Sequence, residues 1–532
     1  MKKYALAYDI GTTGVKTCLF EIEKEITLIG AASQGYELYV FPDGGAEQDP
    51  DEWWAAMIST TKKVIDEAKV SPDVIDGISF CSQMQGLVLV DKDGMPVRRA
   101  MSYMDQRARK ELKENMAYGV QVAGGNVVKV LKSLAITGAA SLSVKDPVYK
   151  YLWVKGNEPE NFRNVHKWLD VKESLIARMT GEFIMTEDSA FATLIYDIKK
   201  KCWSPEMCKM FGVNRDHLAN IIKSTDKVGG LTEKAAAELG LKPGTMVFGG
   251  GGDASLIGVG AGSVGLRDTH VYVGTSGWVS TVVDKSLADT SAMIAATVGA
   301  RPGYYNYFAE LETAGKCLEW VKDHLALDEI GIYLKKTDVA EDMESQYTSL
   351  YQYMSAVTEQ VPAGSNGVIF TPWLHGNRCP FEDPNARAMF FNISLETGKS
   401  ELIRAVAEGV CMHLRWFLET IEKKTETSQI IRFVGGGALA DSTSQILADC
   451  TGRTVETVPS PQNVGAVGAV GAAVVIAVGL GVIDSIDDAG KLIKADKIFK
   501  PNPANKAAYD KNFKAYKELY KSNKEIFKIL NG

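Results

Sequence analysis

Short apolar runs separated by glycine-rich turns recur along the chain and predict alternating strands and helices. An apolar run over 4–8 is followed by the turn GTTG at 11–14 and a second run over 15–22. Strand, turn and strand predict a β-hairpin whose turn displays backbone N–H groups and hydroxyls. A hairpin of the same design is expected over 270–283, with the turn GTSG at 274–277. Its recurrence suggests duplicated domains whose turns face a shared ligand.

Other apolar patterns have helical spacing. Helices are expected over 50–68, 401–418 and 441–450, and residues 108–240 look mostly helical. In the tail, four aromatic residues share one helical face: Tyr509, Phe513, Tyr516 and Tyr520. We expect this tail helix to dock on the body of the protein.

Composition limits the class of protein. A chain of 532 residues is too long for one core, so two or more domains are expected. Its net charge of -7 argues against nucleic acid or an anionic membrane as the main partner. Eight cysteines lie singly with no CxxC pair, which suits a reducing compartment. We expect a cytoplasmic protein.

One uncharged stretch could be mistaken for a membrane span. Residues 464–482 contain no charged side chain, and Gly465, Gly468 and Gly471 line one helical face. The other positions are mainly alanine and valine. Close packing through small residues favours a buried helix.

A single carboxylate follows four glycines near the middle of the chain. The run at 246–248 predicts a buried strand, glycines occupy 249–252, and Asp253 precedes a small-residue segment. A carboxylate at a strand end can take a proton from a hydroxyl. It can equally cap the next helix, and this stretch alone does not decide between the two.

Three further segments offer polar or glycine-rich turns. The strand over 75–81 breaks at Gln83-Met84-Gln85, where amides could select a polar ligand or simply form a turn. Tyr103 and Asp105 precede Arg107, where an exposed ion pair at a helix start is slightly favoured over a ligand contact. A strand over 430–434 runs into GGGA at 435–438, a turn that lets a flat base or ribose approach the backbone.

These features share one chemical explanation. Phosphoryl transfer needs donors that hold phosphate oxygens, Mg²⁺, a base for the attacking hydroxyl and exclusion of water. The two hairpins, Asp253 and the GGGA turn supply candidates for these roles.

The set of motifs resembles the FGGY carbohydrate kinases, members of the actin/Hsp70-like ATPase superfamily, over nearly the whole chain. Residues 147–154 also resemble the family's P-x-x-K-x-x-W signature, and 401–408 match the end of a second one. The resemblance implies an α/β fold of two ribonuclease-H-like domains with an interdomain active-site cleft. Residues 1–252 would bind sugar and carry the first phosphate hairpin, and 253–532 would bind ATP and end in the helical tail.

The resemblance also implies roles for individual residues. ATP and Mg²⁺ would be required, with Asp9 and Asp253 contacting the metal and Asp253 acting as the catalytic base. The implied nucleotide contacts are Gly11, Thr12, Thr13, Lys16, Gly274, Thr275, Ser276, Gly315, Gly436, Gly437, Ala438 and Asp441. The implied sugar contacts are Gln83, Met84, Gln85, Tyr103, Asp105 and Asp253.

Within the family, the segments over 82–91 and 103–108 look most like those of xylulokinases. Gln85 replaces their usual histidine, Tyr103 replaces tryptophan, and Ala254 stands where asparagine often follows the base. Glutamine keeps hydrogen-bonding capacity but has a different reach and does not titrate. The resemblance makes D-xylulose the expected substrate, and the three replacements leave L-ribulose, gluconate or erythritol as alternatives. A homodimer is implied by the resemblance only.

Two other classes of protein fit parts of the pattern. An ATP-binding switch of the actin/Hsp70 type would lack the substrate strand at 82–89. A degenerate sugar sensor would not need Asp9, Asp253 and both hairpins.

Overall fold

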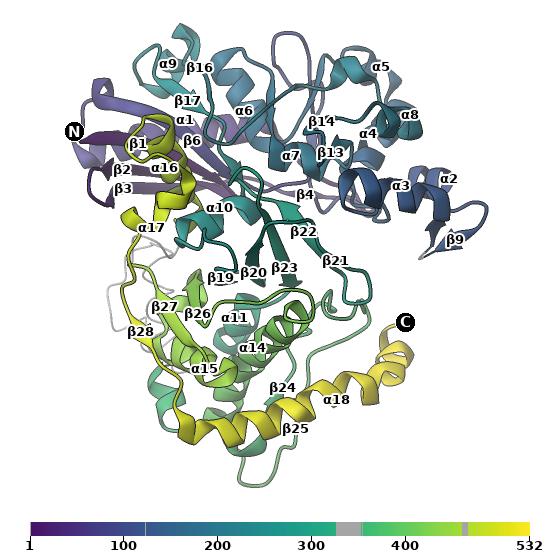
Figure 1. The fold of residues 1–532 in the computed structure, drawn as a ribbon, viewed down its shortest axis with the longest axis vertical. Helices are drawn as coiled ribbons and strands as arrows, with labels where there is room; N and C mark the ends of the chain where they lie inside the picture. The colour runs from purple at the N-terminus through teal and green to yellow at the C-terminus, as the bar shows by residue number, and fades with distance from the viewer. Residues whose placement is uncertain (1, 123, 326–352, 354, 460–465) are drawn as a thin grey trace.

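Two β-sheets form the centres of the two halves of the molecule (Figure 1). The computed structural model describes residues 2–122, 124–325, 353, 355–459 and 466–532. The first sheet has the strand order β16-β17-β6-β1-β2-β3, with β18 also paired to β6. Its strands are β1 (Lys3–Ile10), β2 (Gly14–Ile22), β3 (Ile26–Gly35), β6 (Ile75–Ser82), β16 (Lys227–Gly230), β17 (Met246–Phe248) and β18 (Gly251–Gly252).

The second sheet repeats the design of the first. Its order is β21-β22-β23-β20-β19-β26-β27-β28. The strands are β19 (Thr269–Val273), β20 (Gly277–Val283), β21 (Ala288–Asp289), β22 (Ile294–Val298), β23 (Tyr305–Leu311), β26 (Ile430–Val434), β27 (Thr454–Thr457) and β28 (Ile498–Phe499). The series β3-β2-β1-β6-β17 and β23-β20-β19-β26-β27 have the same directions, two antiparallel pairings followed by two parallel ones. The predicted duplication is confirmed.

Two helices lie between the sheets. α10 (Asp253–Gly260) packs against α16 (Val467–Gly479), and α16 also lies on β1 and β6. A Cβ added to Gly260 would lie 1.9 Å from the Val467 carbonyl oxygen, so the helices approach closely only through glycine. These helices join side chains of both sheets in one apolar cluster. The predicted buried helix is confirmed over 467–479, while 464 and 465 lie outside the described residues.

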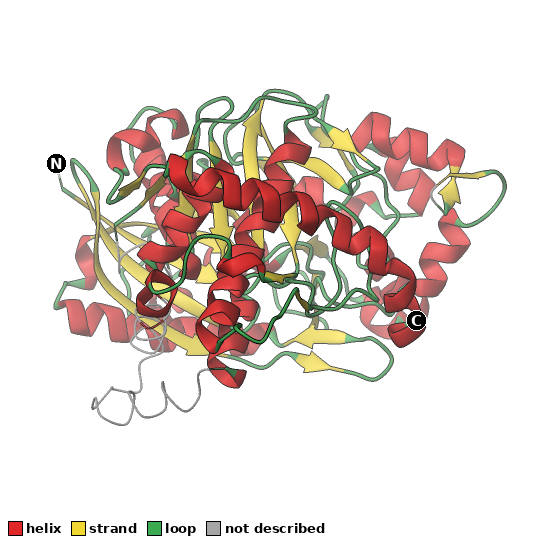
Figure 2. Cartoon of the chain, turned by 90° about the horizontal axis from the view of Figure 1, so that it is seen from below, coloured by secondary structure: helices red, strands yellow, loops and turns green. Residues whose placement is uncertain are grey.

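The outer faces of the sheets are covered by amphipathic helices. α1 (Pro50–Ala68) packs on β2 and β3, and begins at an Asp49 cap as its sequence predicts. α14 (Lys399–Ile421) packs against α11 (Gly315–His324) and α15 (Asp441–Thr451) in the second half. The tail forms α18 (Lys506–Asn531), which crosses the face seen in Figure 2 to the C-terminus. Its Tyr509, Phe513 and Tyr516 are buried, which confirms the predicted docking.

Residues 108–240 are only partly helical, contrary to expectation. The helices are α2 (Arg109–Met116), α3 (Val127–Thr137), α4 (Pro147–Asn157), α5 (Pro159–Arg163), α6 (Val171–Thr180), α7 (Glu187–Ala192), α8 (Pro205–Phe211) and α9 (Glu233–Leu239). Short strands alternate with them: β9 (Gln121–Val122), β10 (Gly125–Asn126), β11 (Lys167–Leu169), β12 (Ile184–Thr186), β13 (Tyr196–Asp197), β14 (Cys202–Trp203) and β15 (Asn220–Ile222). Runs of two to four residues are too short for periodicity to reveal, and tertiary pairing decides their conformation.

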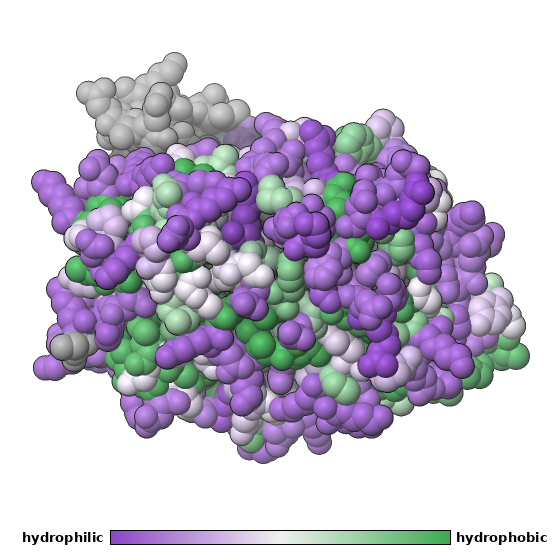
Figure 3. Space-filling model, turned by 90° about the horizontal axis from the view of Figure 1, so that it is seen from above, coloured by the Kyte–Doolittle hydropathy of each residue, from purple (hydrophilic) through white to green (hydrophobic). Residues whose placement is uncertain are grey.

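The remaining elements are short. Among the described residues these include β4 (Tyr39–Val40), β5 (Ala46–Gln48), β7 (Val88–Val90), β8 (Ala100–Met101), β24 (Ile369–Phe370), β25 (Phe390–Phe391) and α17 (Ala489–Leu492). Hydrophilic side chains cover much of the face seen in Figure 3, with apolar areas between them. Within the described ranges, no helix combines the length and apolar character needed to span a bilayer.

The buried imidazole of His413 joins three segments of the second half. Its Nδ1 accepts a hydrogen bond from the Tyr516 hydroxyl of α18 at 2.7 Å, and its Nε2 donates to the Cys379 carbonyl at 2.9 Å. Burial lowers the pKa of His413 to about 4. The neutral ring of His413 in α14 therefore connects the tail helix to the segment that contains Cys379.

His413 should make stability fall in mild acid. Its folded-state pKa is below the unfolded value of about 6.5, so the unfolded state binds the extra proton and stability falls as pH drops from 7 toward 4. Between pH 7 and pH 5, wild type should lose about 2 kcal/mol more unfolding free energy than His413→Gln, whose amide keeps a donor for Cys379 but does not titrate. Denaturant unfolding of both proteins at the two pH values measures this difference. Equal losses would contradict the buried neutral imidazole.

Candidate active site

The register of three strands brings Asp9 and Asp253 together. In the first sheet, β6 lies between β1 and β18, and Cys81 of β6 pairs with Asp9 on one side and with Gly251 on the other. Asp253 follows β18 directly and is the first residue of α10, with Gly252 as the helix N-cap. The carboxylate is thus not the N-cap that one interpretation of the sequence expected.

Both carboxylates have pKa values raised toward neutrality. Burial raises the pKa of Asp253 to about 7, helped by the charges of Asp9 and Glu310 and opposed by a 2.7 Å hydrogen bond from the Ala254 N–H. Burial raises the pKa of Asp9 to about 6, opposed by the charge of Lys16, its cross-strand neighbour. A group that titrates near pH 7 is suited to accept a proton from a hydroxyl.

The same two groups fit a magnesium ion. Within the described ranges, no cluster of three or more His, Cys, Asp or Glu side chains could hold a metal. Mg²⁺ is commonly held by one or two carboxylates together with water and substrate phosphates. The raised pKa values of Asp9 and Asp253 mark a place where a cation would be stabilised.

Side chains from three other segments bind the carbonyl groups of the first hairpin turn. The Tyr36 hydroxyl donates to the Gly11 carbonyl at 2.5 Å and lies 3.0 Å from the Gly14 carbonyl, and the Gln83 amide also donates to the Gly11 carbonyl, at 3.1 Å. The Gln48 amide donates to the Thr12 carbonyl at 2.7 Å. With its carbonyls bound in this way, the turn can offer N–H and hydroxyl groups to an anion. Gln83, predicted as a sugar contact, thus contacts the hairpin.

The second hairpin turn is held by the start of α11. The Gly315 N–H donates to the Gly274 carbonyl at 2.8 Å, and the Lys316 N–H donates to the Thr275 carbonyl at 3.2 Å. A Cβ added to Gly315 would lie 2.2 Å from the Gly274 oxygen. The predicted nucleotide contact Gly315 therefore supports the turn directly. Glu310 lies in β23, which ends at Leu311, and α11 begins at Gly315.

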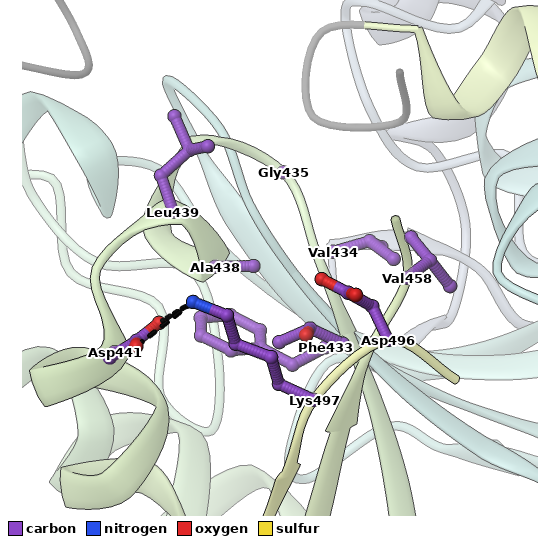
Figure 4. A pocket seen from close by; sticks show the side chains of 10 residues that line it. Phe433, Val434, Gly435, Ala438, Leu439, Asp441, Val458, Asp496 and Lys497 are labelled. Atoms are coloured by element: carbon purple, nitrogen blue, oxygen red, sulfur yellow. Dashed lines mark hydrogen bonds and ion pairs between the residues drawn. The ribbon is translucent and has the colours of Figure 1, made fainter. Parts of the chain in front are cut away.

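A pocket opens beside the GGGA turn (Figure 4). A Cβ on Gly435 would lie 2.6 Å from the Val273 carbonyl, so this turn packs against the end of β19, next to the second hairpin. The pocket is lined by Phe433, Val434, Gly435, Ala438, Leu439, Asp441, Thr457, Val458, Asp496 and Lys497. Lys497 forms an ion pair of 2.8 Å with Asp441 across it. Of the predicted nucleotide contacts, Ala438 and Asp441 line the pocket, and Gly436 and Gly437 belong to the same turn.

Met84 packs against the backbone beside Asp253. A Cβ on Gly252 would lie 2.1 Å from the Met84 sulfur, so only glycine accommodates this contact. The next residue, Gln85, has a φ of +62°, an uncommon conformation for a residue with a side chain. Of the predicted sugar residues, Met84 therefore packs on the backbone just before Asp253, and Gln85 lies next to Met84 in a strained conformation.

Tyr103 and Asp105 occupy different environments. Tyr103 is hydrogen-bonded by the Thr12 side chain, while burial and the charges of Asp253 and Glu310 raise its pKa. The Asp105 carboxylate is fully buried and accepts bonds from Arg107 Nη2 at 2.7 Å and from the Ala46 N–H at 2.9 Å. The Asp105–Arg107 ion pair, expected to be exposed, is therefore buried, with side chains 0% and 10% exposed.

Several groups near Asp253 were not predicted. Glu310 pairs with Arg378 at 2.6 Å, and Asp188 of α7 accepts the Gly252 N–H at 2.8 Å. The charges of Glu310 and Asp188 both raise the pKa of Asp253. Both come from distant segments without a glycine-rich motif, so no local pattern marks them.

Comparisons with known proteins extend over the whole chain. The model of the FGGY family of carbohydrate kinases, N-terminal domain, matches residues 4–260, and that of the C-terminal domain matches 270–477. A xylulose kinase of Bacillus subtilis is 28% identical over 98% of each chain. The crystal structure of a ligand-bound xylulose kinase from Lactobacillus acidophilus has a TM-score of 0.84 at 26% identity, covering 99% of this chain and 100% of that one. A gluconate kinase structure from the same organism has a TM-score of 0.81 at 26% identity, covering 98% of each chain.

The second hairpin should be sensitive to a single methyl group. In Gly315→Ala, the new Cβ would meet the Gly274 carbonyl oxygen, so the turn must move. If this turn holds ATP phosphates, the KM for ATP should rise about tenfold, the loss of roughly one hydrogen bond to a charged group. Steady-state kinetics with ATP varied measures the change. Gly490→Ala is the control, because a Cβ there meets no atom within 4 Å; equal KM values in the two variants would contradict the role of the turn.

Proposed function

Because this chain belongs to the FGGY family of carbohydrate kinases, we propose that it phosphorylates D-xylulose at the terminal hydroxyl, using ATP, to give D-xylulose 5-phosphate. The observation that carries the chemistry is the placement of Asp253, whose pKa is raised to about 7, near Asp9 and directly after Gly252, against which Met84 packs. The preference for xylulose follows from the similarity to xylulose kinases over the full length.

Asp253 accepts the proton of the attacking hydroxyl as the oxygen bonds to the γ-phosphorus of ATP and the bond to the β-phosphate oxygen breaks. The hairpin turns at 11–14 and 274–277 hold phosphate oxygens, and the pocket beside Ala438 and Asp441 receives the nucleoside. Mg²⁺, held by Asp9 and Asp253, would neutralise phosphate charge when bound.

The substrate loop distinguishes this proposal from an ATP-driven switch. Residues 83–86 connect to the first hairpin through Gln83 and to the backbone beside Asp253 through Met84. A switch without a small substrate has no need for that connection. Gluconate, the substrate named for one similar structure, is the alternative within the class, and Gln85 and Tyr103 are the side chains we expect to decide.

We further propose a cytoplasmic enzyme. All eight cysteines lie among the described residues and none forms a disulfide. A homodimer is proposed from the family resemblance alone.

Asp253→Asn should abolish turnover without abolishing nucleotide binding. The amide cannot accept the proton, so kcat should fall by about 10² to 10⁴. Coupled ADP release with and without sugar measures turnover, and titration calorimetry measures ATP binding. Turnover close to wild type would rule out Asp253 as the base.

Wild-type activity should depend on unprotonated Asp253. Because the pKa of this carboxyl is raised to about 7, kcat/KM should decline as pH falls from 8 to 6, whereas an ordinary aspartate would stay ionised there. A pH profile of kcat/KM measures this decline. A profile flat to pH 5 would argue against the raised pKa.

A substrate panel tests the sugar. D-xylulose should give the highest kcat/KM among ketopentoses, gluconate and erythritol in the ADP-release assay. Gln85→His, which restores the residue usual in xylulokinases, should lower the KM for D-xylulose by about tenfold if one stronger hydrogen bond forms. A higher kcat/KM for gluconate would replace xylulose with the aldonate while leaving the kinase assignment in place. ADP formation that ignores every sugar would overturn both.

A further inference from the structure

The ammonium group of Lys150 connects the two loops that carry Gln85 and Tyr103. Lys150 lies in α4, within the segment that resembles the P-x-x-K-x-x-W signature, and is fully buried. Its Nζ donates to the Gln85 carbonyl at 2.8 Å and to the Ser102 carbonyl at 2.7 Å. One side chain therefore fixes the spacing between the loop that breaks β6 and the loop before Asp105.

Asp170 holds the first of these loops from its other side. Its carboxylate accepts the N–H of Gln85 at 3.0 Å and the N–H of Gly86 at 2.9 Å. The backbone of Gln85 is thus bound at its N–H by Asp170 and at its carbonyl by Lys150. A Cβ on Gly86 would lie 2.8 Å from Asp170 Oδ1, so the close approach requires glycine.

These bonds maintain a backbone conformation that is unfavourable by itself. The φ of +62° at Gln85 costs on the order of 1–3 kcal/mol and persists only where the surroundings fix it. The Gln85 backbone is bound at both its N–H and its carbonyl, which fixes the direction of its Cα–Cβ bond. Lys150 and Asp170, which together we call the clamp, therefore set where the Gln85 side chain points. The bond to the Ser102 carbonyl holds the backbone next to Tyr103.

The ammonium group of Lys150 is fully buried, which is costly for a charged side chain. Its two hydrogen bonds go to neutral groups, the carbonyls of Gln85 and Ser102. Burial lowers the pKa of Lys150 to about 7, while the charges of Asp105, Asp170 and Asp146 act in the opposite direction. A buried charge with so little compensation is typical of a functional site.

We propose that Lys150 and Asp170 are positioning residues that clamp the two substrate loops and thereby set which sugar the enzyme accepts. Neither residue needs to touch the sugar, since each acts through the backbone of the loops. The inference rests on the proposed sugar kinase activity and assigns a task to the lysine of the signature segment.

Lys150→Met tests the clamp, because methionine fills similar space and donates no hydrogen bond. The KM for sugar should rise about tenfold or more, as expected for loss of hydrogen bonds from a charged group, while the KM for ATP stays within about twofold. The ratio of kcat/KM for the preferred sugar to that for the next best sugar should fall. Lys155→Met is the matched control: Lys155 lies on the same helix and also donates to a carbonyl, that of Gly212 at 2.9 Å, but at an exposed position.

Asp170→Asn tests the other side of the clamp and remains informative if Lys150→Met does not fold. Asparagine is as good an N-cap for α6 as aspartate, so the helix is retained, but its single acceptor oxygen cannot replace both carboxylate oxygens on the loop. The same rise in sugar KM and loss of selectivity are expected. A folded variant with unchanged sugar KM and selectivity, or with equal rises in the KM for sugar and for ATP, would overturn the clamp.

The two proposals fail in distinguishable ways. If wild type forms ADP with some sugar while the clamp variants keep its KM, the clamp is wrong and the kinase assignment stands. If wild type forms no ADP with any sugar, the proposed function is overturned and the clamp with it.

Discussion

Two carboxylates held side by side in a mostly buried place impose the main constraint on this structure. Like charges repel, and burial favours their neutral forms, so the pKa values of Asp9 and Asp253 rise to about 6 and about 7. Side chains placed this way are unfavourable for folding by themselves. Strand register holds them in place. Because Cys81 pairs in parallel with Asp9 on one side and with Gly251 on the other, the backbone positions of Asp9 and Asp253 are fixed relative to each other.

The two sheets are alike in topology but unlike at the ends of their first strands. Asp9 precedes the first hairpin turn, whereas Tyr272 stands at the corresponding position before the second and stacks on Trp278 with ring centroids 4.1 Å apart. One copy of the hairpin therefore carries a carboxylate at this position, and the other carries an aromatic ring that packs in the apolar cluster between the sheets. The two hairpins share one design, and the residue at this one position gives them different chemistry.

Backbone geometry, more than side-chain contact, connects the substrate and nucleotide regions. Gln83 supports the first hairpin, Met84 lies on the backbone of Gly252, and Lys150 with Asp170 holds Gln85 in its strained conformation. The glycines at 252 and 315 are needed because other chain segments occupy the space that a Cβ would take. Movement of any of these segments would displace the proposed base or a proposed phosphate-holding turn, which is why rigid support is expected around a site that requires accurate alignment.

The sequence by itself determined the longer strands, the two hairpins and the main helices, because periodicity and turn chemistry are local properties. It placed Ile430–Val434 correctly, and the start of α1 at Pro50. It could not place the short strands of 108–240, the burial of the Asp105–Arg107 pair, or the arrival of Glu310 and Asp188 beside Asp253. Most of these depend on contacts between segments tens of residues apart. Only the tertiary structure decided that Gln83 supports a hairpin and that Lys150 reaches two loops, because a donor's partner is set by packing and not by its neighbours in the chain.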